Sequence, residues 1–240
     1  MNDTRPRPDG PRTASSAAAD AIWPADPGEL VSPASLGGTD SPAETDGRRL
    51  RRALNREAVV DALLDLYAEG NLRPSTDEIA ERAGISPRSL FRYFEDADDL
   101  AGEAVARQQA RVLPVLPVEA TPDDPIADRV AALVTQRLRL FATLGKAAHV
   151  SRLRAPFQPR LAEGLAQGRR FLRGQVRTVF AAELAALDEE QAEAALAAAD
   201  ALTSYETYQL LTEDRGFGVD EVRSVLTISL TALLTTGGTR

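Results

Sequence analysis

The chain has 240 residues, 43% of them apolar, and a formal net charge of −8. This length and composition suffice for a sizeable core in one or two domains. The absence of cysteine excludes disulfides and thiolate metal sites, and a single histidine, His149, excludes a histidine metal cluster. Since the sequence also has no glycine-rich phosphate loop, it disfavours an enzyme, and we expect no metal and no cofactor.

No run of about 18 apolar residues is present, which predicts that the chain does not span a membrane. The first thirty residues lack the basic start and apolar stretch of a signal peptide. Together with the lack of cysteine, these features predict a cytoplasmic protein.

Charge is unevenly distributed in the N-terminal part of the chain. Residues 1–47 are rich in Pro, Gly, Ser and Asp and carry three Arg against eight acidic residues. Such a segment cannot bury enough apolar surface to offset chain entropy, so we expect a disordered tail over 1–47. The next nine residues, RRLRRALNR, hold five Arg and no acid. This acidic chain therefore has a local positive segment that suits nucleic acid.

From the arginine segment onward the sequence predicts only helices. The segment 55–70 has apolar residues at helical spacing. A second, short helix begins at Ser75, which forms the sequence pattern of a capping box with Glu78. A third begins at Ser86, with Pro87 at its first position, where a missing N–H costs nothing. Helix, short turn and helix in this order are typical of a helix-turn-helix motif.

The third helix, within AGISPRSLFRYFED (residues 83–96), has two kinds of side chain. We expect Leu90, Phe91 and Phe94 to pack on the first two helices. The polar and positively charged side chains would face outward: Arg88, Ser89, Arg92 and Tyr93. Guanidinium groups can pair with guanine or with phosphate, and a tyrosine hydroxyl can donate to phosphate. The pattern indicates a helix for the DNA major groove; the alternative is a solvated arginine face on a packing helix.

Residues 55–106 resemble the DNA-binding domain of the TetR family of bacterial transcriptional regulators. The motif runs in the family's order and spacing through Ile79-Ala80, Ala83-Gly84-Ile85-Ser86, Leu90-Phe91, Tyr93-Phe94 and Leu100. The resemblance implies that the helix capped by Ser86 is the recognition helix. It implies contacts with bases or nearby phosphates by Pro87, Arg88, Ser89 and Arg92, and mostly phosphate contacts by Ser75, Thr76 and Tyr93. A basic arm for the DNA backbone or minor groove would comprise Arg48, Arg49, Arg51 and Arg52.

Two positions depart from the family pattern. Phe91 stands where the family usually has Tyr, and Ala97 stands where it usually has Lys at the start of the fourth helix. Both changes remove phosphate contacts, and the acidic residues 95–99 would repel the DNA backbone. We expect the basic arm to supply part of the missing attraction and the affinity to fall steeply with salt.

The remaining sequence predicts amphipathic helices near 98–113, 125–145, 160–184, 188–213 and 219–236, with a broken segment at 147–157. We therefore expect an all-α fold of about nine helices. Its parts would be the tail 1–47, a helix-turn-helix domain over 48–107, and a ligand-binding and dimerisation domain over 108–240.

Recognition helices of this layout act in pairs, so we expect a homodimer. The last two predicted helices combine a run of alanines with a broad apolar face. The side chains expected at the dimer interface are Leu202, Tyr205, Val222, Leu226, Leu230 and Leu233. The alternative is that these side chains close the core of their own subunit.

The resemblance also implies a pocket for a small molecule, whose binding moves the fourth helix and changes the separation of the DNA-binding domains. Candidate wall residues are Phe141, His149, Phe157, Phe171, Tyr205 and Tyr208. We expect a homodimeric repressor that a small, largely apolar ligand releases from double-stranded operator DNA. The alternative is an all-helical interaction module that kept the fold but lost specific DNA binding.

Overall fold

The computed structural model describes residues 43–236, and every regular element within them is helical, as the sequence predicts. The α-helices of these residues are α1 (Ala43–Ala68), α2 (Thr76–Arg82), α3 (Pro87–Tyr93), α4 (Ala97–Val112), α5 (Ile126–Arg154), α6 (Pro159–Val179), α7 (Ala181–Ala185), α8 (Glu189–Leu202), α9 (Tyr205–Gln209) and α10 (Val219–Thr236). Short 3-10 turns follow α4 and α5, and a π-helical turn, η4 (Leu210–Asp214), follows α9. None of the helices described is long and apolar enough to cross a membrane.

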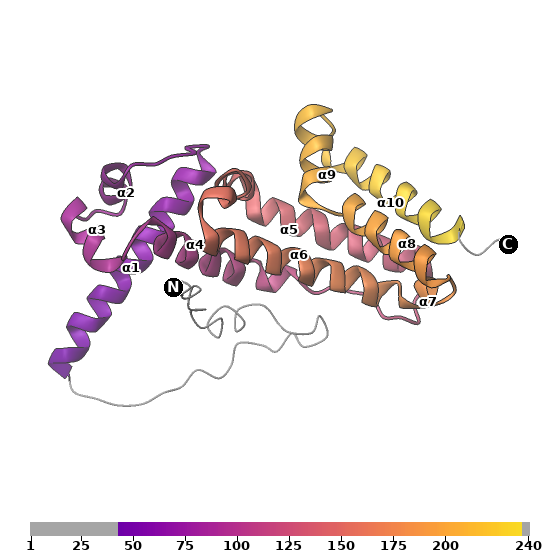
Figure 1. The fold of residues 1–240 in the computed structure, drawn as a ribbon, viewed down its shortest axis with the longest axis horizontal. Helices are drawn as coiled ribbons and strands as arrows, with labels where there is room; N and C mark the ends of the chain where they lie inside the picture. Colours follow the sequence, from indigo (N-terminus) through magenta and orange to yellow (C-terminus); the bar gives the residue numbers. More distant parts are fainter. Residues whose placement is uncertain (1–42, 237–240) are drawn as a thin grey trace, which may run out of the picture.

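Residues 1–42 of the predicted tail, 1–47, lie outside the described residues. Its last five residues belong to α1, which continues without interruption through the arginine segment 48–52. The basic arm is thus the N-terminal part of a helix, and it extends beyond the other helices at one end of the molecule (Figure 1).

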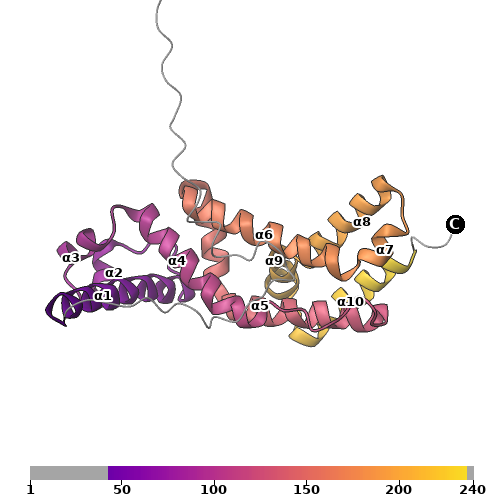
Figure 2. The same cartoon turned by 90° about the horizontal axis from the view of Figure 1, so that it is seen from below.

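The helices form an elongated molecule (Figures 1 and 2). α1, α2 and α3 lie at one end, the long helices α5 and α6 run along the middle, and α8 and α10 lie at the other end. α4 packs against α1 on one side and against α5 and α6 on the other. The domain boundary expected at 107/108 falls inside α4, which runs unbroken from 97 to 112. A displacement of α4 would therefore be felt in both parts.

The core has separate apolar clusters at the two ends. Side chains of α1 to α4 form the first, together with Ala147 and Val150 from the end of α5. Side chains of α5, α6, α8 and α10 form the second. Ala147 and Val150 follow a break in α5 at Gly145, whose φ of 53° places it in the left-handed region that glycine tolerates best. The expected helix 125–145 and the segment 147–157 are thus one element with a bend.

Four of the six side chains expected at the dimer interface lie in the core of their own subunit. Tyr205, Val222, Leu226 and Leu230 are each at most 5% exposed. The last three pack with α5 and α8, so the apolar face of α10 is covered by its own chain. Leu202 and Leu233 are partly buried against the same cluster. The interface prediction was wrong for the four buried residues, because the width of the apolar face reflects several neighbours within one subunit.

Candidate DNA-binding surface and effector cavity

Local capping sets the positions of α2 and α3. Ser75 accepts a hydrogen bond from the backbone N–H of Glu78, and the Glu78 carboxylate accepts one from the backbone N–H of Ser75. Ser86 caps α3 by accepting from the backbone N–H of Ser89 over 3.3 Å, with Pro87 in the first turn. The predicted capping box and N-cap are both present. They leave the first turn of α3 at the surface.

Arg88 and Arg92 on α3 are exposed. Within residues 43–236, neither guanidinium group has a hydrogen bond or an ion pair to another side chain. Four arginines of α1, α2 and α4 pair with carboxylates: Arg56, Arg82, Arg107 and Arg111, as in the 2.8 Å contact of Arg82 with Glu69. The free guanidinium groups on α3 are therefore available to an external anion.

A surface hollow between α1 and α3 gathers positive charge. Arg51, Arg52, Asn55, Arg92 and Tyr93 line it, without an acidic residue. The side-chain amide of Asn55 donates to the Tyr93 hydroxyl over 2.9 Å, and Arg52 Nη2 donates to the carbonyl of Arg92 over 3.4 Å. Because the Tyr93 hydroxyl accepts from Asn55, its own proton is left to donate. The hollow offers the groups that bind a phosphate.

The other predicted DNA contacts differ in how free they are. The Ser75 hydroxyl donates to the Glu78 carboxylate over 2.8 Å, so its proton is already used within the capping box. Thr76 and Arg49 are exposed. The Ser86 and Ser89 hydroxyls lie 2.9 Å apart and bond each other. The Arg48 side chain lies outside what the structure describes.

Phe91 does not join the core as predicted, since 65% of its surface is exposed. Leu90 and Phe94, four residues apart, point inward and are 5% and 3% exposed. The seven-residue helix α3 has only one narrow inner face, and Phe91 falls outside it. The TetR pattern has a phosphate-contacting Tyr at this position, and that resemblance was the signal that could have predicted an exposed side chain.

The acidic residues at the start of α4 are largely engaged by the protein itself. The Asp96 carboxylate accepts the backbone N–H groups of Asp98 and Asp99, both over 2.8 Å. Asp99 accepts from Arg160 of α6 over 2.8 Å, and Asp98 accepts the backbone N–H of Arg160 over 3.1 Å. These contacts reduce the expected repulsion of DNA. They also connect the first turns of α4 and α6.

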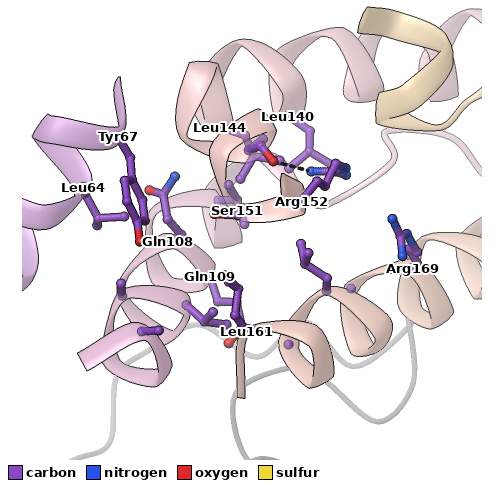
Figure 3. Close-up of a pocket in the computed structure, with 18 of the residues that line it drawn as sticks. Leu64, Tyr67, Gln108, Gln109, Leu140, Leu144, Ser151, Arg152, Leu161 and Arg169 are labelled. Carbon is purple, nitrogen blue, oxygen red and sulfur yellow. Dashed lines mark hydrogen bonds between the residues drawn. The ribbon is translucent and has the colours of Figure 1, made fainter. Parts of the chain in front are cut away.

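An apolar cavity of about 110 Å³ lies where α1, α4, α5 and α6 meet (Figure 3). α1 contributes Leu64 and Tyr67, while leucine, alanine and glycine residues of the other helices form most of the remaining wall. α4 and α6 approach closely beside it, because a Cβ added to Gly164 would overlap Cγ1 of Val105. Whatever fills the cavity touches the helix that leads to the DNA-binding end.

None of the six predicted wall residues lines this cavity. Phe141, Tyr205 and Tyr208 pack on one another, with ring centroids 5.2 to 6.1 Å apart. Phe171 is buried in the same core cluster as Phe141. Two others lie elsewhere: Phe157, which is 74% exposed, and His149, whose Nδ1 lies 2.5 Å from Gln209 Nε2. The prediction was wrong because the large rings fill space against each other, whereas small residues and leucines leave the cavity.

Three polar side chains stand out in the cavity wall. Gln109 is only 5% exposed, and its carboxamide oxygen has no hydrogen-bond partner among residues 43–236. Arg152 and Arg169 lie at the end opposite α1 and both contact Glu206 of α9. Sequence spacing does not indicate this grouping, because the three residues come from three different helices.

Comparison with known proteins agrees with this architecture. Residues 59–104 match the family model of the bacterial regulatory proteins of the tetR family. A transcriptional regulator from Rhodococcus sp. Rha1 has the same fold, with a TM-score of 0.58 and 23% identity over 77% of this chain and 98% of that chain. No curated protein matches the sequence significantly.

Two further solved structures share the fold. One is a candidate transcriptional regulator from Streptomyces coelicolor A3(2), with a TM-score of 0.54 and 24% identity over 75% of this chain and 98% of that chain. The other is the multidrug binding protein EbrR in complex with imidazole, with a TM-score of 0.50 and 19% identity over 72% of this chain and 93% of that chain.

The capped helix pair α2 and α3, with exposed arginines on α3, has the arrangement of a helix-turn-helix motif. Residues 59–104 match the family model of the tetR regulatory proteins, and the described helices share the fold of the Rhodococcus protein.

Proposed function

We propose that this regulator is a homodimeric repressor, released from double-stranded operator DNA by a small ligand in the cavity between α4, α5 and α6. The observation that carries the DNA contact is the exposed Arg88, which has no partner within residues 43–236 although the chain is acidic. In the major groove Arg88 would contact base edges. Ser89 and Arg92 would contact nearby bases or phosphates. The hollow formed by Arg51, Arg52 and Tyr93 would hold a phosphate.

The exposed ring of Phe91 has a role on this surface. An apolar ring at a DNA interface contacts the C5-methyl group of thymine or a sugar, whereas it cannot bond phosphate. The departure from Tyr therefore exchanges one backbone contact for an apolar one. Arginines of α1 supply attraction to the backbone in its place.

We place the dimer contact on the outer faces of α8 and α10, with a second copy of the chain as occupant. Ala194, Ala197 and Ala201 are exposed along one stripe of α8, and Ile228 of α10 is 69% exposed. Small side chains let helices approach closely, and Ile228 supplies an apolar anchor. Both helices lie at the end away from α3, so a partner there leaves the DNA-binding end open (Figure 1).

The ligand would act through α4. This helix forms one wall of the cavity, and its first turn is held to α6 by Arg160, directly after the recognition helix. A cavity of about 150 Å³ admits benzene, so even a molecule with a single ring must push apart the walls of this 110 Å³ space. A ligand that favours the displaced position of α4 lowers the population that binds the operator.

A gel-shift assay with DNA upstream of the protein's own gene tests the function. We expect a shifted band that unrelated DNA competes away only at much higher concentration. If no sequence in a randomised DNA pool is enriched by the full chain, the repressor assignment fails and the interaction module without specific DNA binding becomes the better account.

A further inference from the structure

The cavity has one positively charged end. Arg152 and Arg169 both line it, and both donate to the same oxygen, Oε1 of Glu206, over 3.0 and 2.7 Å. Within residues 43–236 no second carboxylate pairs with either guanidinium group. Two positive charges therefore share one negative charge at this end of an apolar space.

Arg152 is the more enclosed of the two arginines. Its side chain is 18% exposed, its guanidinium lies 4.1 Å from the centre of the Tyr205 ring, and its Nη1 donates to the carbonyl of Ala148 over 3.0 Å. A positive charge in such surroundings gains little from water, so a second anion beside it is strongly favoured. Arg169 is 59% exposed and can turn toward that anion without disturbing the core.

The cavity wall also contains a buried hydrogen-bond acceptor without a donor. The Gln109 oxygen is buried and accepts no hydrogen bond from residues 43–236. A buried acceptor left without a donor costs free energy, which a ligand hydroxyl can recover. Figure 3 shows Gln109 on the α4 side of the cavity, with the arginines on the α5 and α6 sides.

We propose that the effector is a small amphipathic carboxylate with a hydroxyl group on its apolar body. Its carboxylate pairs with Arg152 and Arg169, beside Glu206, which makes two positive and two negative charges. The apolar body occupies the leucine- and alanine-lined space, and the hydroxyl donates to Gln109. Because the volume of about 110 Å³ is below the roughly 150 Å³ that admits benzene, the body is at most one ring or a short chain, and a ring displaces the cavity walls as it enters. The inference rests on the proposed function only in calling this cavity the effector site.

Isothermal titration calorimetry of the full chain, without DNA, tests the charge requirement with benzoate and benzyl alcohol, which have similar size. We expect benzoate to bind at least tenfold more tightly. The Arg169→Ala variant should lose that preference, and Arg170→Ala, a neighbouring exposed arginine outside the cavity wall, should retain it. Equal affinities for the two probes, or no binding of benzoate, would overturn the proposal.

Glu206→Gln separates ligand recognition from a structural role. Removal of the competing carboxylate should raise benzoate affinity severalfold and leave benzyl alcohol affinity unchanged. If Glu206 had only a structural role, its replacement would instead weaken the binding of both probes. In a parallel test, 4-hydroxybenzoate should bind more tightly than benzoate to the wild type and no more tightly to Gln109→Leu, and a preference that survives this change removes Gln109 from the site.

The titrations are independent of operator binding, so the two proposals can fail separately. If benzoate binds as expected but never changes operator affinity, release of the repressor by this cavity is wrong and the carboxylate site stands. If benzyl alcohol binds as well as benzoate and releases the operator, the ligand class is wrong and the repressor mechanism stands.

Discussion

Arg160, in the first turn of α6, donates a hydrogen bond to Asp99, in the first turn of α4, over 2.8 Å. Asp98 accepts the backbone N–H of the same Arg160 over 3.1 Å. These contacts attach α6, which lines the cavity, to the first turn of α4, which follows α3 in the chain. This contact joins the first turns of α4 and α6, so we expect it to influence where α3 points relative to the rest of the subunit.

The Arg160→Ala variant should bind the operator about three- to tenfold more weakly, because α4 is no longer held in one position. Stability should change by less than about 1 kcal/mol, since exposed ion pairs contribute little. Fluorescence anisotropy and urea unfolding measure the two quantities. Arg170→Ala is the control on the same helix. Operator affinity equal to that of the wild type would show that this contact does not position α3.

Joint replacement of Arg51 and Arg52 by alanine should weaken binding to all DNA sequences alike. Both residues line the hollow between α1 and α3, where a phosphate would lie. Removal of two phosphate contacts should reduce the slope of log affinity against log salt by about two. The measurement is a salt titration of operator and unrelated DNA. A slope like that of the wild type would exclude the arginine segment from DNA contact.

How far the sequence predicts the fold depends on how local the signals are. The ends of α2 and α3 follow from Ser75, Ser86 and Pro87, because a cap is a contact within one turn. Leu90 and Phe94 are likewise core residues at helical spacing. Phe91 was misplaced, because Leu90 in the seven-residue helix and Phe94 at its C-cap already occupy the one face that α3 can bury.

The cavity and the dimer face depend on contacts between distant helices, which spacing does not reveal. Val222, Leu226 and Leu230 have the same periodicity whether α10 meets α5 of its own subunit or a partner. The cavity lies beside the close approach of α4 and α6 at Gly164, and no local pattern marks such a place. The predicted wall residues were instead large side chains such as Phe141.

Ile228→Asp should give monomers without unfolding the subunit. The side chain is 69% exposed, so an aspartate there meets water in the monomer but would be buried without a partner in the proposed dimer. Sedimentation velocity measures the mass, and circular dichroism checks the helix content. Leu230→Asp is the contrasting variant, since Leu230 is fully buried and the change should destabilise the subunit itself. A dimer that persists in Ile228→Asp would place the interface elsewhere.

The pair of Arg129 and Glu183 should make stability depend on pH. Hydrogen bonds from Arg129 lower the pKa of Glu183 below its ordinary value of 4.5, although burial acts in the opposite direction. A carboxyl whose pKa is lowered in the folded state stabilises the fold above pH 4.5, and this contribution is lost as the pH falls through the lower folded value.

At pH 7, Glu183→Gln should therefore lower the free energy of unfolding by about 1.5–3 kcal/mol. The difference from the wild type should be smaller at pH 3, because the carboxylate becomes protonated as the pH falls through the lowered pKa of Glu183. Urea unfolding at both pH values measures this, with the exposed Glu163→Gln as control. A difference of equal size at both pH values would mean that the charge of Glu183 is not its cause.

The central claim is that the exposed face of α3 reads operator DNA through Arg88. The direct measurement is the operator affinity of Arg88→Ala beside that of Arg170→Ala, with unrelated DNA as the second ligand. Loss of a base contact should cost about 1–3 kcal/mol on the operator and little on unrelated DNA, while Arg170→Ala should bind like the wild type. Equal operator affinities for Arg88→Ala and the wild type would contradict the account.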